Sequence, residues 1–196
     1  MGRFDGWGVF RYNTGKIKPR GGISAMNELE CVLECRRLLE NVTPLKGDCG
    51  RLCGRACCRP DENGKGGMLL FPGEEALYSG PGGAGFMLVR DDSVTADGLL
   101  LICTSACKRE TRPLGCRFFP LRPTSKGRAV MDRRSAWVCP LYENGVGALD
   151  GEFVAAAGKA AALLCGSERL AEFVRAVGRK IREDRAAGLF GDGGGT

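Results

Sequence analysis

Eight cysteines in the middle of this chain constrain its fold more than any other feature. They form two groups with short gaps, over residues 49–58 and 103–116, followed by Cys139, and the chain contains no histidine. Closely spaced thiolates repel one another and oxidise readily, whereas a bound metal neutralises their charge and keeps the thiols deprotonated. The pattern therefore predicts a soft-metal or iron–sulfur site whose candidate ligands are Cys49, Cys53, Cys57, Cys58, Cys103, Cys107, Cys116 and Cys139.

The cysteines are expected to be reduced or metal-bound rather than paired in disulfides. No apolar run approaches the ~20 residues that span a bilayer, and residues 1–25 lack the apolar segment of a signal peptide. These features predict a cytoplasmic protein without a membrane partner, and disulfides rarely persist in that compartment. The odd total of eleven cysteines also argues against a disulfide framework.

The positive charge of the chain lies mostly in its first segment. Residues 1–25 contain five basic residues and one acidic residue, and the formal net charge of the whole chain is +6. Residues 26–196 are thus close to neutral, which makes nucleic acid an unlikely partner; an unknown protein partner stays open. We expect residues 1–25 to be a disordered, Gly-rich basic leader, or alternatively the physiological chain to start at Met26.

The hydrophobic pattern predicts one small α+β domain over residues 26–187, organised around the cysteine-ligated site, with a disordered tail over 188–196. Residues 47–67 are rich in Gly and Cys, so regular structure is not expected there. The expected helices are 27–42, 73–78, 152–164 and a final amphipathic helix that follows Ser167. The expected strands are 68–71, 86–89, 99–103 and 129–138.

Three cysteines outside the pattern are interpreted as core residues. Cys31 and Cys35 are four residues apart on one side of the first helix, where small core residues are favoured over the alternative of metal ligands. That helix is expected to present Leu29, Val32, Leu33 and Leu39 to the core. Cys165 is expected to lie on an apolar helix and is given the same interpretation.

The spacing of the cysteines favours an iron–sulfur cluster, with zinc as the alternative. Zinc ribbons and knuckles commonly use a C-x2-C turn, and this chain has none. Iron–sulfur clusters need four thiolates but tolerate varied gaps. The adjacent Cys57 and Cys58 point in different directions in an extended backbone, so they are expected to serve two sites, or to pair one ligand with one free thiol. Eight thiols suffice for two four-sulfur sites, and six would serve one site.

Arginines flank the second group of cysteines, and Arg112 and Arg117 are predicted to bind the cofactor. Cationic side chains lower the pKa of thiols and offset the charge of an anionic metal–thiolate centre. The alternatives are a solvated basic loop, or a loop that binds an anionic substrate or phosphate. The sequence has no histidine base, no G-x-S-x-G motif, no phosphate-binding loop and no G-x-G-x-x-G motif.

Two segments of the chain resemble a known family. Residues 53–58 read Cys-Gly-x-x-Cys-Cys, and residues 107–120 read Cys-x4-Arg-Pro-x2-Cys-Arg-x2-Pro. In this order they resemble the bacterial and archaeal family of zinc- or iron-chelating cysteine-cluster proteins, which includes flagellin lysine N-methylase. The resemblance covers about residues 49–140, although each gap in the family's usual C-x2-C-G-x-C-C is one residue longer here. It implies metal or iron–sulfur binding through Cys49, Cys53, Cys57, Cys58, Cys107 and Cys116.

Three functions follow from these observations. The first is a metal- or cluster-binding protein with a role in redox chemistry, metal handling or assembly. The second is an enzyme that uses the cluster, such as a protein similar to protein-lysine methyltransferases. The third is a zinc-stabilised nucleic-acid-binding protein. The sequence names no substrate, and whether the protein is an enzyme stays open.

Overall fold

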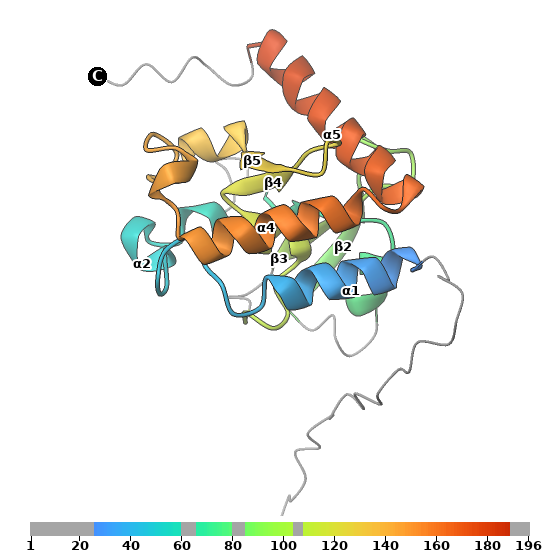
Figure 1. Ribbon diagram of the computed structural model, residues 1–196. Helices are drawn as coiled ribbons and strands as arrows, with labels where there is room; N and C mark the ends of the chain where they lie inside the picture. The colour runs from blue at the N-terminus through green and yellow to red at the C-terminus, as the bar shows by residue number, and fades with distance from the viewer. Residues whose placement is uncertain (1–25, 60–65, 80–84, 104–107, 189–196) are drawn as a thin grey trace, which may run out of the picture.

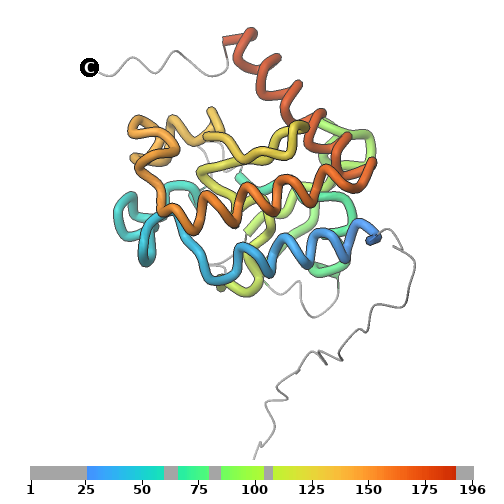
Figure 2. The backbone as a smooth tube through the Cα atoms, in the orientation of Figure 1, coloured from blue at the N-terminus to red at the C-terminus, as the bar shows by residue number. Residues whose placement is uncertain are grey.

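The computed structural model describes residues 26–59, 66–79, 85–103 and 108–188. These residues form a mixed structure of helices and two small antiparallel sheets (Figures 1 and 2). The mixed helix-and-strand fold predicted from the sequence is confirmed. The structure does not show a metal site as its organising centre. The predicted leader and all but the first residue of the predicted tail lie outside the described residues.

Two helices packed side by side form the centre of the molecule. α1 (Glu28–Leu38) and α4 (Gly151–Leu164) run in opposite directions across the front of Figure 1. The predicted capping box starts α1: the Asn27 side chain accepts a hydrogen bond from the Glu30 N–H at 2.9 Å, and the Glu30 carboxylate accepts one from the Asn27 N–H at 3.0 Å. Asp150 caps α4 in a similar way, through the N–H groups of Glu152 and Phe153.

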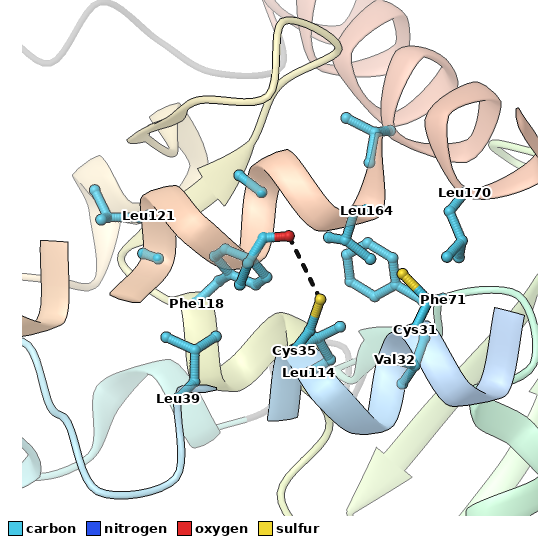
Figure 3. Packing of buried hydrophobic residues seen from close by; sticks show 14 of the residues in the cluster. Cys31, Val32, Cys35, Leu39, Phe71, Leu114, Phe118, Leu121, Leu164 and Leu170 are labelled. Atoms are coloured by element: carbon cyan, nitrogen blue, oxygen red, sulfur yellow. Dashed lines mark hydrogen bonds between the residues drawn. The ribbon is translucent and has the colours of Figure 1, made fainter. Parts of the chain in front are cut away.

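The core between these helices uses two cysteines as structural residues, as predicted. Cys31 and Cys35 are buried beside Val32 and Leu39. Their thiols donate to carbonyl groups of α4: Cys35 Sγ lies 3.4 Å from the Ala160 oxygen, and Cys31 Sγ lies 3.5 Å from the Leu163 oxygen. Figure 3 shows the first of these contacts among the surrounding apolar side chains. Cys165 is half-buried and donates to the Thr124 carbonyl at 3.4 Å.

A three-stranded sheet lies behind the helix pair, with strand order β1-β3-β2. β2 (Phe86–Arg90) pairs antiparallel with β3 (Leu99–Cys103) over their full lengths, and β1 (Met68–Leu69) pairs with the other edge of β3. The predictions of strands at 86–89 and 99–103 are confirmed. The pairing leaves Cys103 at the last position of β3, opposite Phe86.

The second sheet is the hairpin β4 (Leu121–Pro123) and β5 (Ala129–Met131), which contacts α4. α5 (Glu168–Ala186) follows α4, and Ser167 caps it as predicted. α5 packs its apolar face on the core, where the rings of Phe173 and Phe71 have centroids 5.1 Å apart. The remaining short helices are α2 (Gly50–Cys53), η1 (Ala56–Cys58), η2 (Glu74–Leu77), α3 (Leu114–Phe118), η4 (Arg133–Trp137) and η5 (Val146–Ala148).

Four local expectations are wrong. Leu33 is 45% exposed, because the buried stripe of α1 runs through Cys31, Val32 and Cys35 instead. α1 ends at Leu38 rather than near residue 42. The strand expected over 129–138 ends at Met131, since Asp132 then caps η4 by accepting the Arg134 N–H at 3.0 Å. The segment 47–67, expected to be irregular, contains α2 and η1.

No helix within the described part of the chain combines the length and the apolar character that a membrane span requires.

Candidate metal centre

Four of the predicted ligands lie on two short helical turns. Cys49 directly precedes α2, which ends at Cys53, and η1 carries Cys57 and Cys58. Between the two turns, Gly54 and Arg55 both have left-handed backbone, with φ of 57° and 60°. Gly54 ends α2 in a common way for helices, and the Arg55 N–H donates to the Gly50 carbonyl at 2.9 Å. A left-handed arginine is uncommon, and here it turns the chain so that η1 folds back beside α2.

The sulfur atoms of Cys57 and Cys58 lie 3.9 Å apart. In a tetrahedral zinc–thiolate site with bonds of about 2.3 Å, neighbouring sulfurs are about 3.8 Å apart. Extended backbone sends neighbouring side chains to opposite faces, but these two residues are in a 3₁₀ turn. The expectation that they point in different directions is therefore wrong, and the pair has the separation of two ligands of one ion.

The thiols of Cys57 and Cys58 shift each other's pKa in opposite directions. The hydrogen bond from Cys57, with smaller contributions from Arg112 and Arg55, lowers the pKa of Cys58 to about 6, although burial opposes this shift. The same hydrogen bond, together with burial, raises the pKa of Cys57. The lowered pKa favours a thiolate within the pair at neutral pH in the metal-free protein. The thiolate is the form that binds metals and acts as a nucleophile.

Four more predicted ligands interact electrostatically with Cys57 or with one another. After Cys58 and burial, the charges of Cys53 and Cys116 also raise the pKa of Cys57. Burial raises the pKa of Cys49, and Cys139 and Cys53 add to this effect. Cys53 likewise adds to the burial that raises the pKa of Cys139. Because charges separated by much more than a Debye length interact little, these couplings place six of the eight predicted ligands in one neighbourhood, with Cys53 common to both groups.

The seventh predicted ligand, Cys103, lines a cavity together with Cys57, Cys58 and Cys116. The cavity has a volume of about 470 Å³, and its wall includes apolar side chains such as Ile102, Phe118 and Phe119. A volume of this size is within the range of small-molecule sites. The eighth, Cys107, lies outside the described residues.

The thiols are gathered but do not form a finished coordination sphere. Over residues 26–59, 66–79, 85–103 and 108–188, no three Cys, Asp or Glu side chains lie close enough together to hold one ion. Every residue of 49–59 is exposed or half-buried. Coordination of one ion by three or more of the described thiols would therefore require them to come closer together.

The two predicted cofactor-binding arginines have different surroundings. Arg112 lines the cavity, contributes to the lowered pKa of Cys58, and opposes the rise in the pKa of Cys49 that burial causes. Arg117 is buried and donates to backbone carbonyls of Arg36, Arg109, Glu110 and Arg112 at 2.9 to 3.3 Å. Burial, with the nearby Arg36 and Arg109, lowers the pKa of Arg117 to about 10. Its hydrogen bonds to these carbonyls fix the loop that carries Arg112.

A buried carboxylate supports the same loop, and sequence reasoning missed it. Glu74 has no exposed surface; it accepts hydrogen bonds from the Leu114 N–H at 2.7 Å and the Phe71 N–H at 3.3 Å, and forms an ion pair with Arg36 at 3.0 Å. Arg36 also contacts the Tyr78 hydroxyl and the Glu110 carbonyl. Glu74 lies in the helix expected over 73–78, and no sequence period links it to the cysteines.

Comparison with known proteins finds no matching family, no curated protein of similar sequence and no solved structure of similar fold. The resemblance of residues 49–140 to the cysteine-cluster family therefore stays a prediction from the motifs.

Proposed function

We propose that the protein binds a soft metal or an iron–sulfur cluster through its clustered thiolates. The observation that carries the proposal is the Cys57–Cys58 pair, with sulfurs 3.9 Å apart and the pKa of Cys58 lowered to about 6. Two sulfurs at ligand separation, one of them ionised at neutral pH, are suited to capture a thiophilic ion. Cys53 and Cys116, whose charges act on Cys57, are the candidates to complete a four-sulfur site.

The donor set fits the group that the sequence implies. All candidate ligands are thiols, which select zinc, copper(I) or iron–sulfur clusters over magnesium and calcium. Arg112 and Arg55 already stabilise negative charge on Cys58, and they would do the same for an anionic metal–thiolate centre. An iron–sulfur cluster is the first candidate because of the number of thiols and the absence of a C-x2-C turn, and zinc is the second.

The proposed role is redox chemistry, metal handling or assembly in the cytoplasm, where thiols stay reduced. A bound cluster would supply electron transfer, and a bound zinc ion would supply structural stability. The protein's own residues hold the thiols together, keep one of them ionised and offset the charge through the two arginines.

Anaerobic purification, followed by metal analysis and an absorption spectrum, tests the proposal. A brown protein with broad absorbance near ~400 nm and matching iron and sulfide would support the cluster. A colourless protein that contains zinc would support the second candidate. A protein that contains neither metal, and that takes up neither when reconstituted under reducing conditions, would contradict both.

Serine substitutions identify the ligands. Cys57→Ser, Cys58→Ser and Cys116→Ser are each expected to lower the metal content of the purified protein. Cys35→Ser is the matched control, because Cys35 is buried between α1 and α4 and donates to the Ala160 carbonyl. If Cys57→Ser and Cys58→Ser both retain the full metal content, the pair is not the site.

A cluster-dependent enzyme is the second candidate function, and the cavity beside the thiols favours it. The cavity of about 470 Å³ is lined by Cys57, Cys58, Cys103 and Cys116, so a small substrate would lie next to the proposed centre. Methyl transfer to protein lysine is the reaction class that the family resemblance implies. Calorimetry with S-adenosylmethionine and the anaerobically purified protein tests it: saturable binding favours the enzyme, and no heat of binding at millimolar cofactor argues against it.

A further inference from the structure

A second recess lies between α5 and the β4–β5 hairpin, which neighbour each other in Figure 1. It has a volume of about 460 Å³, and no Asp or Glu is among the described residues that line it. Its lining contains six cationic side chains: Arg122, Lys126, Arg128, Arg175, Arg179 and Arg182. We call this recess the basic groove. Like charges held this close repel one another, so the groove favours an anion.

Among the described residues, no carboxylate forms an ion pair with a cation of the basic groove. Elsewhere, Arg169 at the start of α5 pairs with Asp97 at 2.7 Å, and Lys180 pairs with Asp184 at 2.5 Å. Within the described part of the chain, none of the six groove cations forms an ion pair. Asp132, the nearest acid to act on Arg122, is already bound by the guanidinium of Arg134. The positive charge of the groove is thus left for a ligand from solution.

Two of the guanidinium groups converge over a glycine. A Cβ atom added to Gly178, in the middle of α5, would lie 3.7 Å from Arg182 Nη1 and 3.9 Å from Arg122 Nη1. A single point beside the helix is therefore within 4 Å of both groups, and only hydrogen occupies that side of Gly178. Glycine inside a helix is less favourable than alanine, and here it leaves space between two cations.

Arg122 forms the inner wall of the groove. Its Nη1 donates to the Pro123 carbonyl at 3.2 Å, while its buried Nε has no acceptor among the described residues. Burial lowers the pKa of Arg122, Arg134 and Arg182 add to this effect, and Asp132 opposes it. A half-buried guanidinium beside another cation is stabilised when an anion binds next to it.

We propose that the basic groove binds a small anion that carries two or more phosphoryl groups. Arginine binds phosphate oxygens in bidentate fashion, and the convergence over Gly178 suits one phosphoryl group. Arg175, Arg179 and Arg182 extend the positive charge along one face of α5 for about 10 Å, which suits a second. An extended nucleic-acid strand is the weaker alternative, because the charge is concentrated in a recess rather than along a surface.

The groove adjoins the proposed metal centre, since Arg122 and Val174 line both the groove and the cysteine cavity. The proposal nevertheless does not depend on a metal. It rests on the positions of the cations around Gly178, and it can be tested on the metal-free protein as well as on the loaded one.

Titration calorimetry of the full chain with inorganic pyrophosphate is the test. Pyrophosphate is expected to bind saturably, and Arg182→Gln is expected to weaken binding about tenfold, since a charge-assisted hydrogen bond is lost. Arg185→Gln is the matched control: Arg185 is exposed on the last turn of α5, does not line the groove and gives the same change in charge. Circular dichroism of both variants checks that α5 stays folded.

Any one of three different outcomes would overturn the proposal. Equal weakening by Arg182→Gln and Arg185→Gln would mean that the helix attracts anions through diffuse charge. Absence of pyrophosphate binding at millimolar concentration would mean that the groove is not an anion site. Salt-dependent binding of a single-stranded oligonucleotide that pyrophosphate does not displace would assign the surface to nucleic acid instead.

Discussion

The carboxylate of Glu74 accepts a hydrogen bond from the backbone N–H of Leu114 at 2.7 Å, across 40 residues of sequence. Leu114 begins α3, so its N–H is one of the donors that a helix leaves without an intrahelical partner. Cys116 lies on the same turn, two residues later. A residue outside the cysteine motifs therefore fixes the position of the turn that carries a predicted ligand.

Glu74→Gln is expected to lower the free energy of unfolding by about 3 kcal/mol, because it leaves Arg36 without its buried partner. The side chains of this pair are 0% and 11% exposed. The substitution also brings an amide NH2 group, which is a donor, next to backbone N–H groups that now donate to the carboxylate. Urea denaturation measures the change. Glu75→Gln is the control, since the Glu75 side chain is half-buried and its substitution should stay within about 0.5 kcal/mol. Equal midpoints for the two variants would contradict the role given to Glu74.

Arg117→Lys separates a structural role from cofactor binding. Arg117 donates to four backbone carbonyls at once, and a lysine ammonium cannot reproduce that planar geometry. We expect the metal-free variant to lose about 2 kcal/mol of unfolding free energy. Arg133→Lys, at an exposed position, is the control. Suppose instead that the metal-free variant is as stable as the metal-free wild type, while the variant as purified contains less metal than the wild type. Arg117 then binds the cofactor, as the sequence predicts.

The elements that the sequence predicted well carry local signals. The capping box of Asn27 and Glu30, the Ser167 cap and the apolar repeat from Leu170 to Ile181 each lie within one helix, so local spacing reveals them. Glu74 and α3 were missed because their stability depends on contacts between distant segments. The strand expected over 129–138 failed for a local reason, because the Asp132 side chain starts a 3₁₀ turn.

In the candidate site too, some features could be predicted from the sequence and others could not. The spacing of the thiols led to the prediction that they form one group, and this stays a prediction. The structure links six of them through pairwise electrostatic interactions in which Cys53 is common to both groups. The orientation of Cys57 and Cys58 was not predictable, because it depends on the left-handed backbone of Gly54 and Arg55. Sequence pattern favours glycine at such positions, but it gives no reason to expect arginine there.

Cys58 of the metal-free protein is expected to react with iodoacetamide at unusually low pH. The hydrogen bond from Cys57, with Arg112 and Arg55, lowers the pKa of Cys58 to about 6. Below that pH, Cys58 is protonated and unreactive; above it, the thiolate reacts, whereas an ordinary thiol needs a pH near 8.5. Mass spectrometry of the alkylated peptide across pH 5 to 9 measures the profile. Cys57→Ser removes the thiol partner and should move the midpoint upward; a wild-type midpoint near 8.5 would contradict the lowered pKa of Cys58.

Metal removal should loosen residues 49–59 without unfolding the helical core. Of the seven predicted ligands that the structure describes, none is among the fully buried residues of the core that α1, α4 and α5 form, although Cys139 packs against it. We therefore expect this core to stay folded without the metal. Residues 49–59 bury no side chain fully, so we expect their order to depend on the bound metal.

Hydrogen exchange of the loaded and the chelated protein measures both regions. Amides of α2 and η1 are expected to exchange at least about tenfold faster after chelation, which corresponds to about 1.4 kcal/mol of local opening free energy. Amides of α1 and α4 should change little. Global unfolding on chelation would mean that the metal organises the whole fold, and unchanged exchange over 49–59 would mean that the metal binds elsewhere.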